Sequence, residues 1–335
     1  MQILATIKDV AELAGVSIAT VSRVVKGNEN VSAKTAAKVT SAIKQLNYHP
    51  NALARQLKHQ CTNNIIVIIP DISNTFFHEI LHGIEETAEK NDMHILIADM
   101  HIKTSIEEYY LRALMQKEVD GIISFSANVA QQLLKQAANG FPLVIACQYL
   151  DSIDIPSITI DNVAAAKEIC NHLIASGKKN IAHLTALPNF FLYQDRLDGY
   201  TASLRENGLD FRAGLIRYCS PNIKSGYEQT LSLLDSGIYF DSIFAAGDTM
   251  AIGAIRALKE RGISIPDECA VAGFDDIEMS SLIDPPLTTI RQPKYQIGCD
   301  AMNMLISLIR GTHIEKRNIV VEHQLVIRQS SCSVN

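Results

Sequence analysis

The segment His78-Glu79-Ile80-Leu81-His82 matches the H-E-x-x-H motif, in which two histidines one helical turn apart bind zinc and the glutamate is a general base. The helix predicted here carries its apolar side chains, such as Phe77 and Ile84, on the side opposite the histidines. No third ligand stands at a known spacing. We therefore expect both histidines on a solvated or subunit-contact face, and we predict no metal.

The sequence lacks the glycine signatures of other catalytic sites. It contains no GxGxxG, no GxxxxGK[ST] and no GxSxG, which mark dinucleotide sites, phosphate-binding loops and nucleophile elbows. Carboxylates are plentiful, but no pair is placed for general acid–base catalysis. We predict a protein that is not an enzyme and has no cofactor. The enzyme alternatives are a zinc hydrolase at His78 and His82 and a nucleoside hydrolase.

The charge of the chain is divided unevenly along its length. Residues 1–60 contain eight Lys and Arg against three Asp and Glu, a net charge of +5. The remaining 275 residues contain 22 basic and 33 acidic residues, a net charge of −11. A small basic module before a large acidic body indicates a nucleic-acid partner at one end.

Three short helices are predicted in the first 50 residues. Thr6 is expected to cap the first helix, which ends at Gly15, where glycine permits the positive φ of a tight turn. Ser17 should cap the second helix, over Ile18 to Val25, and Ser32 the third. Two short helices joined by a glycine-containing turn, with a third behind them, are typical of a helix-turn-helix module. A generic three-helix bundle with a solvated basic face is the alternative.

The second helix presents side chains that could contact DNA. Val21 and Val24 are expected on its inner face, which leaves four side chains outward: Ile18, Ala19, Ser22 and Arg23. Apolar groups contact thymine methyls, and arginine pairs with a guanine edge or reaches a phosphate. Residues 51–58 follow as a basic, Ala- and Leu-rich helix that is too small to bury its own apolar face. Such a helix needs a groove or a second copy of itself.

From Thr62 onward, short β-branched runs alternate with amphipathic helical patterns. Continuous apolar strands between such helices predict parallel sheets covered on both faces. The series breaks near Asp161 and again near Ile290, which predicts two doubly wound lobes with a ligand crevice between them. Strands are expected at Ile65–Ile69, His94–Ala98, Gly121–Ser124, Leu143–Ala146, Ile181–Leu184, Ser242–Ala246 and Ala270–Gly273.

Several motifs resemble the LacI family of transcriptional repressors, and the likeness continues to the C-terminus. The N-terminal motifs that carry it are Thr6-Ile7-Lys8-Asp9-Val10-Ala11, Ala14-Gly15-Val16-Ser17, Ala19-Thr20-Val21-Ser22-Arg23-Val24-Val25, Tyr48-His49-Pro50-Asn51 and Ala52-Leu53-Ala54-Arg55. The resemblance implies an α/β fold class: an N-terminal all-α helix-turn-helix domain plus a two-lobed, periplasmic-binding-protein-like, doubly wound effector domain. The implied domains are residues 1–50, a hinge at 51–61, an N-terminal lobe of 62–161 with 291–322, and a C-terminal lobe of 162–290 with 323–335.

The resemblance also implies how the chain meets DNA. The second helix would lie in the major groove of a double-stranded operator. The hinge helices of a homodimer would pair in the minor groove, where Leu57 would wedge between base steps. Packing within the helix is the alternative for Leu57. The implied DNA contacts are Thr6, Ser17, Ile18, Ala19, Thr20, Ser22, Arg23, Asn30, Ser32, Tyr48, Asn51, Ala54, Leu57 and Lys58.

A set of residues between the lobes is implied to bind a small-molecule effector. The set is Asn74, Phe76, Asp161, Phe190, Arg196, Asp248 and Asp275. Thr75 and Gly247 stand where the family pattern has proline and asparagine. Because glycine has no side chain, the polar contact that asparagine makes there is not carried over to Gly247. A structural cap or ion pair is the alternative for the charged residues, and a core position for Phe76. Phe77 is expected in the core.

The effector's identity rests on likeness alone. The segments Pro70-Asp71-Ile72, Asp284-Pro285-Pro286-Leu287-Thr288-Thr289-Ile290 and Gln292-Pro293 look most like the cytidine-type nucleoside repressors of the family. A nucleoside is therefore the first expectation, and a sugar or sugar phosphate the second. The hinge pattern is more orderly than in the cytidine type. The tail after Gln329 lacks heptads, which predicts no tetramerising coiled coil.

Cysteine spacing and the N-terminus indicate the compartment. Seven cysteines are scattered without a CxxC pair, which favours reduced thiols. The sequence shows no basic, apolar leader and no apolar run long enough to span a membrane. We expect a cytoplasmic protein without a membrane partner. A secreted solute-binding protein, which has the same two-lobed cleft, would need an export signal.

Overall fold

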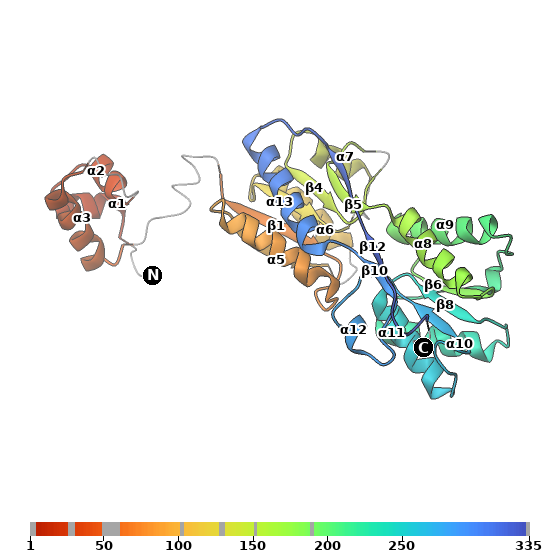
Figure 1. Cartoon of the computed structure of the whole chain (residues 1–335). Coiled ribbons are helices and arrows are strands. Elements are labelled where there is room, and N and C mark those ends of the chain that lie inside the picture. Colours follow the sequence, from red (N-terminus) through yellow and green to blue (C-terminus); the bar gives the residue numbers. More distant parts are fainter. Residues whose placement is uncertain are drawn as a thin grey trace. The chain divides into compact units, whose positions relative to one another are not determined.

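The computed structural model describes residues 5–25, 31–48, 61–100, 104–126, 131–150, 153–187 and 191–332 (Figure 1). The chain divides into two compact units, Met1–Thr62 and Asn63–Asn335. Each has its own buried apolar clusters. None of the helices in the described ranges has the length and apolar character needed to cross a membrane.

The first unit contains the three predicted helices, α1 (Ile7–Ala14), α2 (Ile18–Val25) and α3 (Ala33–Gln45). The Thr6 hydroxyl accepts the Asp9 amide while the Asp9 carboxylate accepts the Thr6 amide, a reciprocal cap that fixes the start of α1. Gly15 ends α1 with φ of 65°, the left-handed conformation expected at the turn. The predicted helix-turn-helix arrangement is therefore confirmed.

The core of this unit is small and aliphatic. Val10, Val21 and Val39, one from each helix, are fully buried together. Tyr48 also packs into this cluster and is 8% exposed. Tyr48 thus supports the helices from inside, and the DNA contact that the family resemblance implies for it stays a prediction.

One lobe of the second unit is built on a six-stranded, wholly parallel sheet. Helices α5 (Phe76–Glu89) and α13 (Lys294–Arg310) cover one face, and α6 (Thr104–Met115) and α7 (Gln131–Ala138) cover the other. The strand order is β11 (Asn318–Val321), β5 (Ser157–Ile160), β4 (Leu143–Ala146), β3 (Gly121–Ser124), β1 (Asn64–Ile69) and β2 (His94–Asp99).

The other lobe has a four-stranded parallel sheet. Helices α8 (Asn162–Ala175) and α9 (Phe191–Glu206) cover one face, and α10 (Ile223–Asp235) and α11 (Asp248–Glu260) cover the other. The strand order is β7 (Ile216–Tyr218), β6 (Ile181–Thr185), β8 (Ser242–Ala245) and β9 (Ala270–Ala272). A 3-10 turn (Ala213–Leu215) precedes β7, and a short helix, α12 (Met279–Leu282), follows β9.

The chain passes between the lobes three times. It crosses after β5, again between β10 (Thr289–Arg291) and α13, and again between β11 and β12 (Gln324–Val326). Strands β10 and β12 pair antiparallel beside these crossings. The predicted pair of doubly wound, parallel lobes is confirmed, and all seven predicted strands are present within one residue of their expected bounds.

Helices α5 and α13 approach unusually closely. A Cβ atom at Gly83 would overlap the Tyr295 carbonyl oxygen, and a Cβ at Gly298 would overlap the Ile80 carbonyl oxygen. Only glycine fits at this crossing, so the two helices pack as one layer beneath the sheet.

Candidate effector pocket and DNA-binding module

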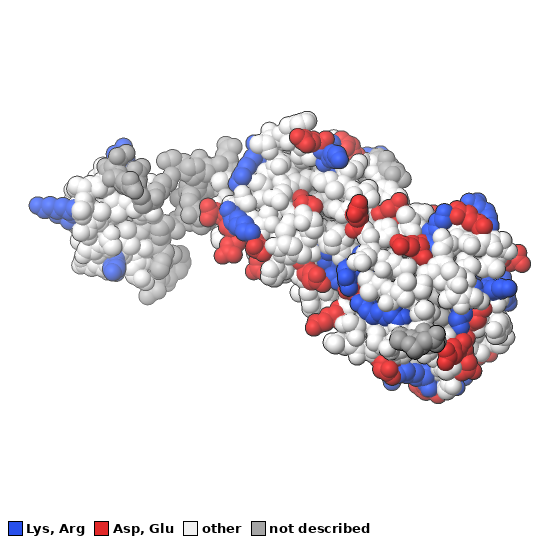
Figure 2. Space-filling view, in the orientation of Figure 1, with Lys and Arg blue, Asp and Glu red and all other residues white. Residues whose placement is uncertain are grey.

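The outward face of α2 combines apolar and basic side chains. Ile18 is 44% exposed, Ala19 and Arg23 are exposed, and Thr20 and Ser22 are half-buried. Lys and Arg are the charged side chains visible on the face of this unit shown in Figure 2, whereas the second unit shows both signs. An exposed isoleucine beside an arginine suits contact with base edges and phosphates.

Three of the predicted DNA contacts are helix caps. The hydroxyls of Thr6, Ser17 and Ser32 accept the amides of Asp9, Thr20 and Thr35. Each therefore fixes the start of a helix, where unpaired amides favour a phosphate group. The predicted contacts Asn30, Asn51, Ala54, Leu57 and Lys58, and the predicted effector contact Phe190, lie outside the described residues.

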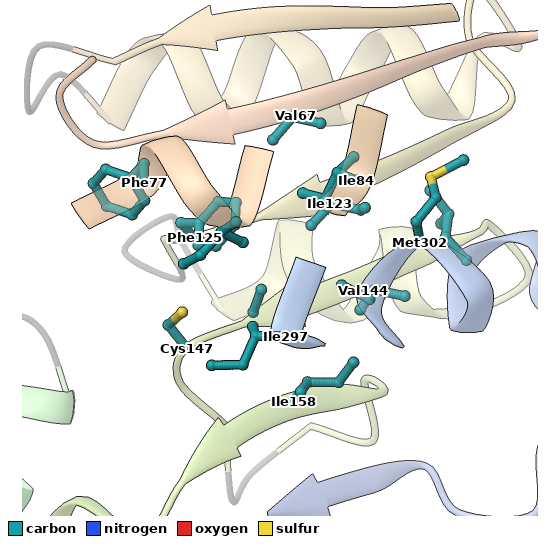
Figure 3. Close-up of a cluster of buried hydrophobic side chains, with 14 of the residues drawn as sticks. Val67, Phe77, Ile84, Ile123, Phe125, Val144, Cys147, Ile158, Ile297 and Met302 are labelled. Atoms are coloured by element: carbon teal, nitrogen blue, oxygen red, sulfur yellow. The ribbon is translucent and has the colours of Figure 1, made fainter. Parts of the chain in front are cut away.

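A pocket lies between the two lobes at the carboxyl ends of their strands, as expected for doubly wound sheets. The first lobe contributes an apolar wall, in which Phe125 and Cys147 directly follow β3 and β4. Phe77 contacts Phe125 edge to face, with ring centroids 5.2 Å apart. Figure 3 shows these three side chains at one end of the buried core of this lobe. The lining is Pro70, Asp71, Asn74, Phe76, Phe77, Phe125, Cys147, Leu192, Tyr193, Arg196, Pro221, Asn222 and Asp275.

Arg196 and Asp275 form the polar wall on the other lobe. The Arg196 guanidinium donates to Asn162 Oδ1 (3.0 Å), to the Ala246 carbonyl and to Asp275 Oδ1 (3.4 Å). It also lies over the Phe274 ring, 3.6 Å from the centroid. Within the described residues three of its five N–H groups are thereby engaged, so the other two can donate to a ligand.

The electrostatics of this pair follow from its burial. Burial raises the pKa of Asp275 above the ordinary carboxyl value, while the nearby Arg196 and Lys294 partly offset that rise. Gln292 Nε2 donates to Asp275 Oδ1 at 2.8 Å and fixes the carboxylate further. The Cys147 thiol faces the same pair, and burial raises its pKa, so it is a neutral wall group and not a nucleophile.

Two asparagines present amide donors to the pocket. Asn74 Oδ1 accepts the Phe76 amide at the start of α5, and Asn222 Oδ1 accepts the Ser225 amide at the start of α10. In the described part of the chain, neither Nδ2 has a hydrogen-bond partner. Both amide groups can therefore donate to hydroxyl or carbonyl oxygens of a ligand.

The structure brings together four predicted effector residues, Asn74, Phe76, Arg196 and Asp275, but it leaves out Asp161 and Asp248. Asp161 is exposed, accepts the Ala164 amide as the cap of α8, and borders a separate hollow. Asp248 is buried behind the pocket. Its carboxylate accepts the Ile277 amide and the hydroxyls of Ser280 and Thr289.

Asp248 should make stability depend on pH. Burial and the nearby Asp275 raise the pKa of Asp248 to about 7, above its value in the unfolded chain. The native state then binds more protons than the unfolded state between about pH 4 and 7, so this carboxyl's contribution to stability is full below that window and is lost as pH rises. Between pH 5 and 7.5 we expect a loss of roughly 2 kcal/mol from this group.

Asp248→Asn isolates this effect because asparagine does not titrate. Urea unfolding of the two proteins at pH 5 and 7.5 should show the stability advantage of the wild type over the variant shrinking as pH rises. Parallel pH profiles for wild type and variant would contradict the assignment.

Sequence reasoning missed several lining residues. Phe125 and Cys147 stand one residue after predicted strands, which is the signal that could have identified them. Asn222 opens a helix after a short strand that was not predicted.

In the H-E-x-x-H segment, His78 and His82 are exposed on α5 as expected. Within the described ranges, no group of three or more His, Cys, Asp or Glu is arranged to hold a metal ion.

Family models match both units of the chain. The model for bacterial regulatory proteins of the lacI family covers residues 6–51, and the model for periplasmic binding proteins and the sugar binding domain of the LacI family covers residues 62–329. The chain belongs to the LacI family of bacterial regulatory proteins.

Individual relatives agree with this membership. The HTH-type transcriptional regulator RegA of Clostridium saccharobutylicum is 38% identical, covering 97% of this chain and 99% of the relative. The HTH-type transcriptional repressor CytR of Escherichia coli K12 is 33% identical, covering 98% and 96%. Among solved structures, the lac repressor dimer bound to operator and the anti-inducer ONPF has a TM-score of 0.86 and 30% identity, covering 98% of this chain and 99% of that one.

Proposed function

We propose that the protein is a transcriptional repressor whose affinity for a double-stranded operator is controlled by a small effector bound between the lobes. The observation that carries this proposal is the pairing of an exposed DNA-reading helix face, Ile18, Ala19 and Arg23, with an interlobe pocket built around Arg196 and Asp275. A solved relative, the lac repressor dimer bound to operator and an anti-inducer, supports a protein that binds both DNA and a small molecule.

The pocket favours an uncharged ligand with a planar apolar group and several hydroxyls. Its charged lining consists of one guanidinium, Arg196, and two carboxylates, Asp71 and Asp275, so a phosphate would meet an excess of negative charge. Phe76 and Phe77 offer a stacking wall, and the Asn74 and Asn222 amides offer donors. A nucleoside has this chemistry. An unphosphorylated sugar is the second candidate, supported by the same polar groups and by the sugar-binding domain model.

A homodimer is supported by apolar side chains left exposed on the second unit. Leu96 and Ile97 are 49% and 48% exposed on β2, an edge strand, and Leu282 on α12 is 75% exposed. Exposed aliphatic side chains at a sheet edge are a liability unless a partner covers them. A two-fold dimer would also set two α2 helices at the spacing of operator half-sites.

Effector and operator would be coupled through lobe closure. The three interlobe crossings allow the lobes to rotate about them, and a ligand that contacts both walls of the pocket stabilises the closed arrangement. A change in lobe spacing across the dimer would then order or release the hinge helices of residues 51–58. Bound effector would change the affinity for the operator, and bound operator would change the affinity for the effector by the same factor.

A ligand panel tests the effector assignment. Thermal unfolding of the purified protein with cytidine, adenosine, uridine, ribose, glucose and the corresponding phosphates should show stabilisation by a nucleoside and none by its phosphate. Stabilisation by a sugar phosphate alone would contradict the proposed ligand class. The best ligand should then change the mobility shift of the native operator, with a scrambled DNA duplex as the control.

The hinge gives a second test. Leu57→Gly is expected to weaken operator binding by about tenfold or more, because the wedge and the hinge helix that the family resemblance implies would both be lost. A gel shift on the native operator measures this loss. Effector binding should stay unchanged in the same variant, and unchanged operator affinity would contradict the hinge mechanism.

A further inference from the structure

Lys294 is a buried lysine that joins the two lobes beside the pocket. It is the first residue of α13 in the first lobe and is 4% exposed. Its ammonium donates to the carbonyls of Asp276 (2.6 Å) and Asp275 (3.3 Å), which follow β9 in the other lobe. It also pairs with Glu79 Oε1 on α5 at 2.9 Å. One cation thus contacts both lobes through three oxygen atoms.

The turn that Lys294 contacts has an uncommon backbone conformation. Asp275 and Asp276 have φ of 111° and 47°, and neither is glycine. Residues other than glycine adopt positive φ only where the surroundings hold them there. Arg291 and Arg328 donate to the Asp276 carboxylate and hold its side chain in place. The Lys294 ammonium holds the backbone carbonyls of Asp275 and Asp276.

This conformation determines where the Asp275 carboxylate lies. With the turn in place, that carboxylate accepts from Arg196 and Gln292 and lines the effector pocket. The third oxygen on Lys294 belongs to Glu79, which stands in the first turn of α5. Phe76, which opens that helix, lines the opposite wall of the same pocket. Lys294 therefore contacts both the helix that carries Phe76 and the turn that carries Asp275, which line opposite walls of the pocket.

We propose that Lys294 is a positioning residue of the effector site, which holds the Asp275–Asp276 turn for ligand binding and ties it to the start of α5. Because the close α5–α13 packing at Gly83 and Gly298 fixes Lys294 relative to α5, movement of the turn is transmitted to the first lobe. The part of this proposal that concerns ligand affinity rests on the proposed function, whereas the part that concerns the turn does not.

Hydrogen exchange of the full-length, ligand-free protein in D2O tests the structural part. Lys294→Met removes the ammonium at nearly constant side-chain length. We expect exchange about tenfold faster at residues 275–277 and in the first turn of α5, with the rest of the second unit unchanged. Glu79→Ala, at an exposed position, should speed exchange in the first turn of α5 alone. Lys90→Met, which breaks an exposed ion pair with Glu86 on the same helix, is the matched control and should speed neither.

Two results would overturn the proposal. One is wild-type exchange at residues 275–277 in a folded Lys294→Met protein. The other is a uniform increase over the whole second unit, which would assign Lys294 a general stabilising role. If Lys294→Met fails to fold, Lys294→Gln keeps an N–H donor without the charge and should show an intermediate, still local, increase.

Cytidine titration tests the ligand part with the same variants. We expect Lys294→Met to raise the Kd for cytidine by about tenfold, because the Asp275 carboxylate loses its fixed position, and Lys90→Met to leave it unchanged. Unchanged cytidine affinity in Lys294→Met would overturn this part. If the wild type does not bind cytidine, the nucleoside assignment has failed, and the exchange experiment still decides the role of Lys294.

Discussion

Arg196→Met should weaken effector binding by about a hundredfold or more, because the substitution removes the guanidinium from the pocket wall and leaves the Asp275 carboxylate without its arginine partner. Methionine keeps an apolar side chain over the Phe274 ring, so the packing below the pocket is largely kept. Isothermal titration with the nucleoside found in the ligand panel measures the change.

The loss at Arg196 should be much larger than general weakening of the fold would produce. Arg261→Met is the matched control, because Arg261 pairs with Asp235 on the surface of the same lobe, away from the pocket lining. That exposed ion pair should contribute less than about 1 kcal/mol to the free energy of unfolding. Effector affinity within threefold of wild type in Arg196→Met would contradict the placement of the site.

Removal of residues 1–62 should abolish operator binding and leave effector binding intact. The chain divides at Thr62. The described residues of the second unit form hydrophobic clusters of their own, so this unit has the core needed to fold alone. The exposed face of α2 and the excess of basic residues are both lost. We expect the specific affinity to fall by at least about a thousandfold, to the level of non-specific binding or below.

The truncated protein provides its own internal control. Its affinity for the nucleoside should match that of the full chain within about twofold in the absence of DNA. Fluorescence anisotropy with a labelled operator measures the DNA arm, and calorimetry measures the ligand arm. Operator binding by the truncated protein would contradict the assignment of DNA contact to the first unit.

Periodicity predicted most of the fold because the buried strands have strong signals. Ile65–Ile69 is a continuous run of β-branched residues, and it became β1, a buried interior strand of the six-stranded sheet. Five strands in the described ranges were not predicted. Three of them, β7, β10 and β12, have three residues each, and β5 is Ser-Ile-Thr-Ile. The fifth, β11, is a four-residue strand at the sheet edge. The sequence pattern also did not indicate which strands lie at the edge of a sheet. Leu96 and Ile97 have the composition of a buried strand, yet β2 lies at the sheet edge and exposes both.

The pocket was predictable only in part, for reasons of geometry. Arg196 and Asp275 came from the family resemblance and face each other in the structure. Asp161 and Asp248 stand at the starts of α8 and α11, where a carboxylate can point either at helix amides or into a crevice. Sequence alone does not distinguish these directions. Lys294 had no signal, because its partners are carbonyls from the other lobe and a helix far away in sequence.

The central claim is that one ligand site and one DNA site are coupled, and reciprocity tests it most directly. Operator affinity of the full-length protein should be measured with and without saturating nucleoside, and nucleoside affinity with and without saturating operator. We predict that both affinities change by the same factor, at least about fivefold, and that Arg196→Met removes the effect at the same nucleoside concentration. Operator affinity that is identical with and without a nucleoside shown to bind in the pocket would contradict the account.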